Sequence, residues 1–152
     1  MTDSILKAWT EVVQPLLRRP PECQVAALCF RTEGDETKVL LISSRDTGRW
    51  VVPKGWLMEG KTAAEAARAE AWEEAGVKQA IGDDQVIGTY SYGKRLDDGY
   101  VSPVEVQVFE LDVIETTDLY PEARERKRVW VKPHEAANMV DESGLQALFQ
   151  RM

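Results

Sequence analysis

Residues 55–77 read GWLMEGKTAAEAARAEAWEEAGV, and this stretch decides how the rest of the chain is interpreted. Its second half is rich in Ala and Glu, which are both good helix formers. Thr62 is placed to act as an N-cap, and Glu65 follows three residues later, as in a capping box. Gly76 stands where a helix commonly ends in the left-handed conformation. The sequence therefore predicts a helix over residues 62–75.

Three carboxylates in this predicted helix, Glu70, Glu73 and Glu74, are spaced i, i+3 and i+4 and so lie on one helix face. Like charges at this spacing repel one another, which favours a cation between them. A Glu-rich helix is more often only a solvated helix. Oxygen ligands suit a hard cation, so a metal at this face would be Mg2+ or Mn2+.

The remaining pattern predicts a mixed α/β fold, because strands and helices follow one another without strict alternation. Strands are expected at 25–30, 39–42, 50–52, 86–92, 104–108 and 129–131, and later helices from Pro133 and over 142–150. Helical spacing over 4–18, ended by Pro20 and Pro21, predicts an N-terminal helical appendage within residues 1–22. Residues 23–152 then form the main domain of a single-domain protein.

Composition restricts the possible partners of this 152-residue chain. Its net charge of −7 argues against broad nucleic-acid binding, although a local basic pocket for a small phosphorylated ligand is compatible with it. No apolar run approaches the ~20 residues that span a membrane, and no basic-then-apolar leader opens the chain. We therefore expect a cytoplasmic protein with Cys23 and Cys29 both reduced, and the oligomeric state stays open.

The spacing of residues 55–77 resembles the Nudix box, a signature that places Gly, Glu, Glu-Glu and Gly at fixed intervals. The positions that fall on it are Gly55, Glu70, Ala71, Glu73, Glu74, Gly76 and Val77. Two positions depart from it, because Lys61 stands where the family has its first Glu and Ala69 where the family has Arg. Those two family residues commonly pair, so losing both leaves no lone buried charge.

Flanking segments resemble the diphosphoinositol-polyphosphate phosphohydrolase branch of the Nudix family. They are VAALCFR at 25–31, VLLISS at 39–44, RWVVPKGW at 49–56 and RERKRVWV at 124–131. The resemblance implies an α/β/α sandwich around a mixed β-sheet. It also implies hydrolysis of phosphoanhydride bonds in diphosphoinositol polyphosphates, dinucleoside polyphosphates or related nucleoside diphosphate-linked compounds.

The resemblance also implies roles for individual residues. Glu70 and Glu74 are expected to bind Mg2+ or Mn2+, and Glu73 is expected to take the proton of the attacking water. Glu105 is kept open as an extra carboxylate from a neighbouring strand. The expected substrate contacts are four cations and one glycine: Arg45, Lys54, Arg126, Arg128 and Gly55. Gly55 lacks a Cβ, so the backbone there can come close to the metal or to a phosphate.

Two other functions remain open at this level. One is an RNA 5′-end pyrophosphohydrolase of the same catalytic class, which the net charge disfavours. The other is a catalytically silent nucleotide sensor with a Nudix-type fold, which the departures at Lys61 and Ala69 favour. Four tryptophans could stack on a base, although packing is the commoner role of such residues: Trp50, Trp56, Trp72 and Trp130.

Overall fold

The computed structural model describes residues 22–152, so the helical appendage predicted for the N-terminus lies outside the described residues. In that part a single sheet of eight strands forms the centre of the molecule. The strands are β1 (Glu22–Glu33), β2 (Glu36–Ser43), β3 (Trp50–Val51), β4 (Lys54–Trp56), β5 (Val77–Ile81), β6 (Val86–Arg95), β7 (Val101–Thr116) and β8 (Arg128–Val131). The helices are α3 (Ala63–Ala75), α4 (Pro133–Met139) and α5 (Ser143–Gln150).

The sheet is mixed because its two central strands, β1 and β7, run parallel while their other neighbours pair antiparallel. The strand order is β3-β2-β1-β7-β5, with β4 paired to β1, β6 to β7 and β8 to β2. Pairing of β4 with the start of β1 brings Lys54 opposite Ala26 and Gly55 opposite Val25. This short strand carries the beginning of the 55–77 segment onto the sheet.

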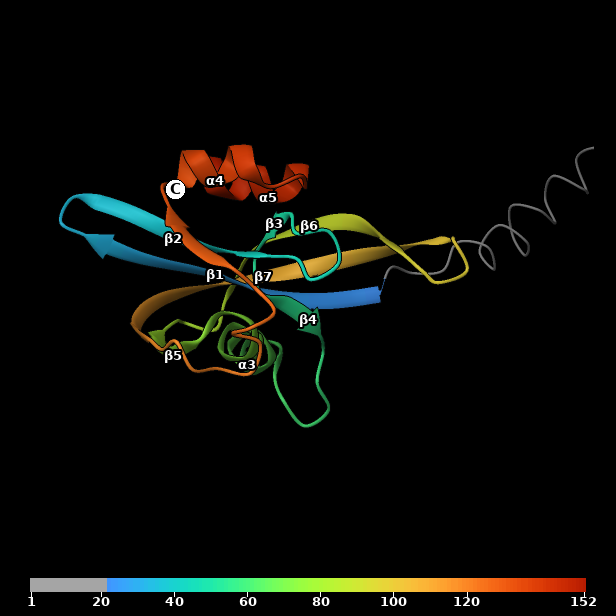
Figure 1. Cartoon of the computed structure of the whole chain (residues 1–152), viewed down its shortest axis with the longest axis horizontal. Coiled ribbons are helices and arrows are strands. Elements are labelled where there is room, and N and C mark those ends of the chain that lie inside the picture. The colour runs from blue at the N-terminus through green and yellow to red at the C-terminus, as the bar shows by residue number, and fades with distance from the viewer. Residues whose placement is uncertain (1–21) are drawn as a thin grey trace, which may run out of the picture.

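Both faces of the sheet are covered, since α4 and α5 lie on one side and α3 on the other (Figure 1). Alternation along β1 explains the two cores, because successive side chains of a strand point to opposite faces. Ala26 and Leu28 pack with residues of α4 and α5, whereas Val25, Ala27 and Cys29 pack with α3. The arrangement confirms the expected α/β/α sandwich.

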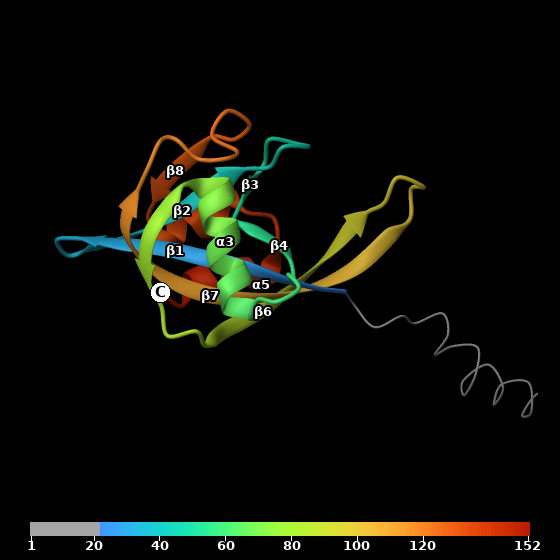
Figure 2. The same ribbon diagram turned by 90° about the horizontal axis from the view of Figure 1, so that it is seen from below.

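Helix α3 forms as its sequence predicts and lies across the sheet (Figure 2). The Thr62 hydroxyl accepts from the Glu65 N–H, and the Glu65 carboxylate accepts from the Thr62 N–H. Gly76 ends the helix with φ of 70°. Its buried face is mostly alanine, including Ala67 and Ala71, so the helix backbone approaches β1 closely. That close approach places the glutamates of α3 next to β4.

Three features of the sheet were not predicted, and one of them is the short strand β4 at Lys54–Trp56. Strand β5 has only Val77 buried along its five residues, so it lacks the alternation that would reveal a half-buried strand. Strands β6 and β7 are longer than expected and form a hairpin that extends away from the rest of the sheet (Figures 1 and 2). The residues near the tip of the hairpin are polar or exposed, so the alternation of apolar and polar residues that marks a half-buried strand is missing there.

The structure also bears on membrane-spanning helices and on the two cysteines. None of the helices within residues 22–152 has the length and apolar character needed to cross a bilayer. Cys23 is exposed and Cys29 is buried, and both are free. They stand six residues apart on β1, which at ~3.3 Å per residue is too far for a disulfide.

Candidate functional site

A cleft of about 820 Å³ opens beside α3, and all of the predicted site residues except Arg128 line it. One wall is the face of α3 that carries Glu70, Glu73 and Glu74. Strand β4, the 44–49 loop and the segment 122–126 contribute most of the cations, and the β6–β7 hairpin contributes Tyr92 through Asp97. The cleft therefore sets acidic groups against basic groups, an arrangement suited to a metal-neutralised polyanion.

The carboxylates of α3 are placed by the alanine face of the helix. Glu70 and Glu74 are buried, while Glu73 is half-buried, and all three line the cleft. Gly55 of β4 lies directly over the Glu70 side chain, because a Cβ on Gly55 would collide with the Glu70 carboxylate. The close approach explains why a residue without a side chain stands at position 55.

Burial makes the two buried carboxylates, Glu70 and Glu74, costly to ionise. Burial is the largest cause that raises the pKa of Glu70 from its ordinary value of 4.5 to about 8, and the charge of Glu74 is the next. Burial raises the pKa of Glu74 too, although the nearby Arg126 guanidinium and the Lys54 N–H oppose the effect. The surroundings of Glu70 and Glu74 therefore stabilise the ionised forms of these two carboxyls poorly.

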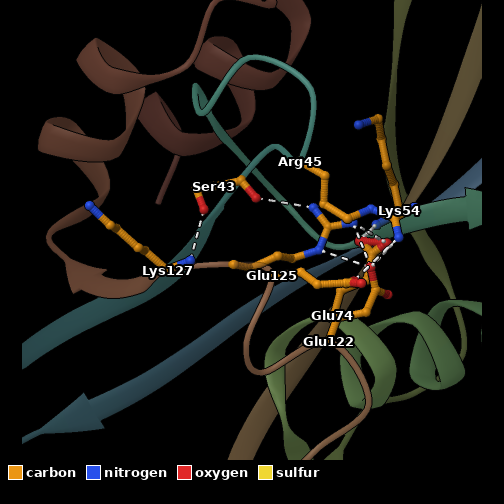
Figure 3. A network of polar contacts seen from close by, with 8 residues as sticks. Ser43, Arg45, Lys54, Glu74, Glu122, Glu125 and Lys127 are labelled. Carbon is orange, nitrogen blue, oxygen red and sulfur yellow. Dashed lines mark hydrogen bonds and ion pairs between the residues drawn. The ribbon is translucent and has the colours of Figure 1, made fainter.

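Arg126 contacts this face directly. Its Nη2 lies 3.3 Å from Oε2 of Glu74 and 3.1 Å from Oε1 of Glu122, and its Nη1 donates to the carbonyl of Ser43 at 3.1 Å. Only 8% of the Arg126 side chain is exposed. The other Glu74 oxygen, Oε1, accepts from the Lys54 N–H at 3.2 Å. Figure 3 shows Glu74 and Glu122 gathered beside Lys54 and Arg45.

Glu122 is a site residue that sequence reasoning missed. Its backbone N–H donates to the carbonyl of Glu73, which fixes the 117–127 segment against the end of α3. Its carboxylate accepts from Arg126 and lies 3.3 Å from Arg45. The i, i+4 spacing of Glu122 and Arg126 was the available signal. Nothing in that spacing indicated that the segment folds back onto the helix.

The remaining cations of the cleft differ in how firmly they are held. The Arg45 side chain is 56% exposed and bridges Glu122 and Glu125. Arg49 donates to Glu142 at 2.6 Å. Burial lowers the pKa of Lys54, against the opposing pull of Glu74. Arg45 and Lys54 thus line the same cleft as the glutamates of α3, and their contact with substrate stays a prediction.

Arg128 has a different position from the other predicted substrate contacts. Its Nη1 donates to the carbonyl of Ala75, and its guanidinium lies over the ring of Tyr120 and pairs with Asp118. Among the described residues, the cleft lining includes neither Arg128 nor Glu105. Arg128 therefore holds the C-terminus of α3, where an Arg also complements the helix dipole.

Among the four tryptophans, Trp56 is the one that lines the cleft, and it is 39% exposed. The Lys94 ammonium of the β6–β7 hairpin lies 4.7 Å from the centre of its ring. In contrast, Trp50 and Trp130 pack against the two cores. Of the four tryptophans considered for stacking on a base, Trp56 is therefore the one whose position in the cleft is compatible with that role.

The donor chemistry of the α3 face fits a divalent metal, because it offers carboxylate oxygens, a glycine cradle at Gly55 and a raised pKa at Glu70. Within residues 22–152, no three His, Cys, Asp or Glu side chains already converge in an arrangement that would enclose an ion. Arg126 instead lies against Glu74, with its Nη2 3.3 Å from Oε2 of Glu74.

The departures at Lys61 and Ala69 have little structural consequence. Lys61 is exposed and forms no ion pair within the described residues, so no charge is left unpaired in the interior. Arg68, one position before Ala69, donates to the carbonyls of Ala80 and Gly82. It ties α3 to the end of β5.

Comparisons with known proteins concern the family and the fold of this chain. Human diphosphoinositol polyphosphate phosphohydrolase 2 is 31% identical over 117 residues, which is 77% of this chain and 61% of the human protein. The chain thus matches less than two thirds of the length of that relative. The C. elegans Ap4A hydrolase superposes with a TM-score of 0.61 at 17% identity, covering 87% of this chain and 96% of that one.

A MutT protein from Methanosarcina mazei superposes with a TM-score of 0.65 at 22% identity, covering 88% of this chain and 94% of that one. At such identities these two likenesses concern the fold. The family model described as NUDIX domain matches residues 23–150, which include every strand from β2 onward, all three helices and the whole cleft. The chain therefore belongs to the NUDIX domain family.

Proposed function

We propose that this protein is a metal-dependent hydrolase that cleaves phosphoanhydride bonds in small polyphosphorylated compounds. The observation that carries the proposal is the cleft itself, in which three carboxylates of α3 face Arg45, Lys54 and Arg126. A phosphoanhydride is a compact polyanion, and its hydrolysis depends mainly on positioning and charge stabilisation. A cleft with both signs of charge provides for a metal and for phosphate oxygens.

In this proposal Glu70 and Glu74 hold Mg2+ or Mn2+. The ion supplies charge neutralisation at the phosphates and lowers the pKa of a water nucleophile. Glu73 takes the proton of that water, and its half-buried position on the cleft wall suits a group that must reach both solvent and substrate. The missing side chain of Gly55 leaves room for the Glu70 carboxylate.

Arg45, Lys54 and Arg126 provide the phosphate contacts in the proposal. The planar forks of Arg45 and Arg126 match phosphate oxygens in pairs. Arg128 is left out, because it is bound to the end of α3. The proposed substrates are diphosphoinositol polyphosphates or dinucleoside polyphosphates. The name of the human relative supports the first class, and the name of the C. elegans protein supports the second more weakly.

The test is a panel of such polyphosphates incubated with Mg2+, followed by detection of released phosphate or nucleotide. Glu73→Gln and Glu74→Gln should each lower turnover by at least ~10² with the fold retained, the scale of lost acid–base catalysis. Glu59→Gln makes the same chemical change at an exposed residue and serves as the matched control. Wild-type turnover in both site variants would refute the roles assigned to them.

Absence of turnover across the whole panel, with folded protein that still binds nucleotide, would instead favour the sensor function. Two measurements separate the cases. A sensor would bind its ligand equally well in Glu73→Gln, and its ligand binding would not be accompanied by turnover at any point of a metal titration. An enzyme that depends on metal should lose turnover with a chelator and regain it with Mg2+.

A further inference from the structure

We propose that Arg126 is the resident counter-cation of Glu74, that it leaves Glu74 when a divalent ion binds, and that it then contacts substrate phosphate. The inference rests on the proposed function, because it concerns the order in which the same cleft takes up metal and substrate. It assigns Arg126 two successive partners. Metal loading would thereby create a phosphate-binding group that the metal-free protein keeps occupied.

The contacts of Glu74 support this exchange. Its Oε1 accepts from the Lys54 N–H at 3.2 Å, and its Oε2 lies 3.3 Å from Nη2 of Arg126. The Glu74 side chain is only 9% exposed, so solvent offers little alternative neutralisation. The guanidinium of Arg126 thus already neutralises Oε2, the oxygen that a metal ion would take. Arg126 and the metal therefore compete for the same carboxylate oxygen.

Charge supplies the driving force for the exchange. A guanidinium keeps its proton at every physiological pH, so Arg126 cannot reduce repulsion by losing charge. A doubly charged ion beside Glu70 and Glu74 neutralises the helix face and repels the neighbouring guanidinium. Movement is then the available response. The ion pair with Arg126 also explains how the buried carboxylate of Glu74 is tolerated without metal.

The remaining contacts of Arg126 determine how far it moves. Nε and Nη2 bond to Glu122, and Nη1 donates to the carbonyl of Ser43. These contacts need not break when the one to Glu74 does, so the side chain stays anchored at the cleft wall. Glu122 itself is held by its N–H to Glu73. The Nη2 N–H that is released from Glu74 is then available in the cleft for a phosphate oxygen, while Nη2 keeps its bond to Glu122.

A purely structural role for Arg126 makes the opposite prediction. If Arg126 only positions Glu74 for the metal, removing it should weaken metal binding. If it competes with the metal, removing it should strengthen metal binding and weaken substrate binding. The two roles therefore differ in sign, and metal affinity measured without substrate separates them.

The experiment measures Mn2+ affinity by electron paramagnetic resonance and Mg2+ affinity by calorimetry, in the wild type, Arg126→Met, Arg126→Lys and Arg45→Met. Arg126→Met should bind either ion at least ~10-fold more tightly, the scale of one charge-assisted contact. Arg126→Lys retains the charge and should fall between Arg126→Met and the wild type. Arg45→Met removes a nearby cation that does not touch Glu74, so its gain should be smaller. For the Mg2+-dependent reaction, Arg126→Met should raise KM.

A second measurement uses the wild type and so does not depend on how a variant folds. The Nε–H resonance of Arg126, assigned by its absence in Arg126→Lys, should shift on addition of Mg2+. The Nε–H resonance of Arg68, whose guanidinium bonds backbone carbonyls at β5 and just after it, should stay in place. An unmoved Arg126 resonance at saturating Mg2+ would overturn the inference.

Failure of the inference is distinguishable from failure of the proposed function. If the wild type binds Mg2+ and turns over substrate but Arg126→Met binds metal no more tightly, the exchange is refuted and the hydrolase remains. If the wild type binds no metal at all, the proposed function fails and the exchange fails with it.

Discussion

Replacing Gly55 with Ala tests the geometry of the site most directly. The added Cβ would collide with the buried carboxylate of Glu70, although the backbone of β4 at this position accepts alanine. Crowding a packed site costs ~1–3 kcal/mol. Glycine to alanine in a strand otherwise gains ~0.5–1 kcal/mol. The expected net loss is about 0–2.5 kcal/mol, or a fall in Tm of up to roughly 10 °C for a domain of this size.

The assay is a double-mutant cycle of thermal unfolding with Gly55→Ala and Glu70→Ala. With the Glu70 carboxylate removed, the alanine at position 55 should become stabilising by ~0.5–1 kcal/mol, because its cost comes from that one contact. The sign of the Gly55→Ala effect should therefore reverse between the two backgrounds. In the protein that keeps Glu70, Gly55→Ala displaces the Glu70 carboxylate and should therefore also weaken Mn2+ binding by about tenfold or more.

Additive effects, within ~0.5 kcal/mol in the two backgrounds, would refute the reasoning. They would mean that Gly55 is needed for its backbone and not for the space above Glu70. Metal affinity unchanged in Gly55→Ala would separately show that the Glu70 carboxylate does not depend on this cradle.

Three further predictions concern residues around the site. Lys61→Glu should keep kcat/KM within about threefold of the wild type, because Lys61 is exposed, and a large loss would reveal a contact made only with substrate. Arg128→Ala should lower stability by ~1–2 kcal/mol through its lost bond to the Ala75 carbonyl, with KM unchanged, as measured by unfolding and by steady-state kinetics. Burial raises the pKa of Cys29 to about 12, so roughly one thiol in ten thousand is ionised at pH 8. Iodoacetamide should then label Cys23 alone in the folded protein by mass spectrometry, and labelling of Cys29 before unfolding would contradict its burial.

Much of the acidic wall was predictable because it depends on local chemistry. The capping box of Thr62 and Glu65, the final Gly76 and the spacing of the glutamates all act within one helix. Helical periodicity alone puts Glu70, Glu73 and Glu74 on one face. The continuous apolar run of β1 and the alternation of buried residues in β7 were likewise readable, because both patterns are local.

Only the tertiary structure decided how the cations are used. Arg126 and Arg128 are two residues apart in one basic run, yet Arg126 contacts Glu74 whereas Arg128 binds the end of α3. The difference arises because the 117–127 segment folds back onto the helix through the N–H of Glu122. Sequence specifies interactions between near neighbours by their spacing, whereas contacts between distant segments depend on how the chain packs as a whole. The helix carboxylates were therefore determined by the sequence, and their counter-cation by the fold.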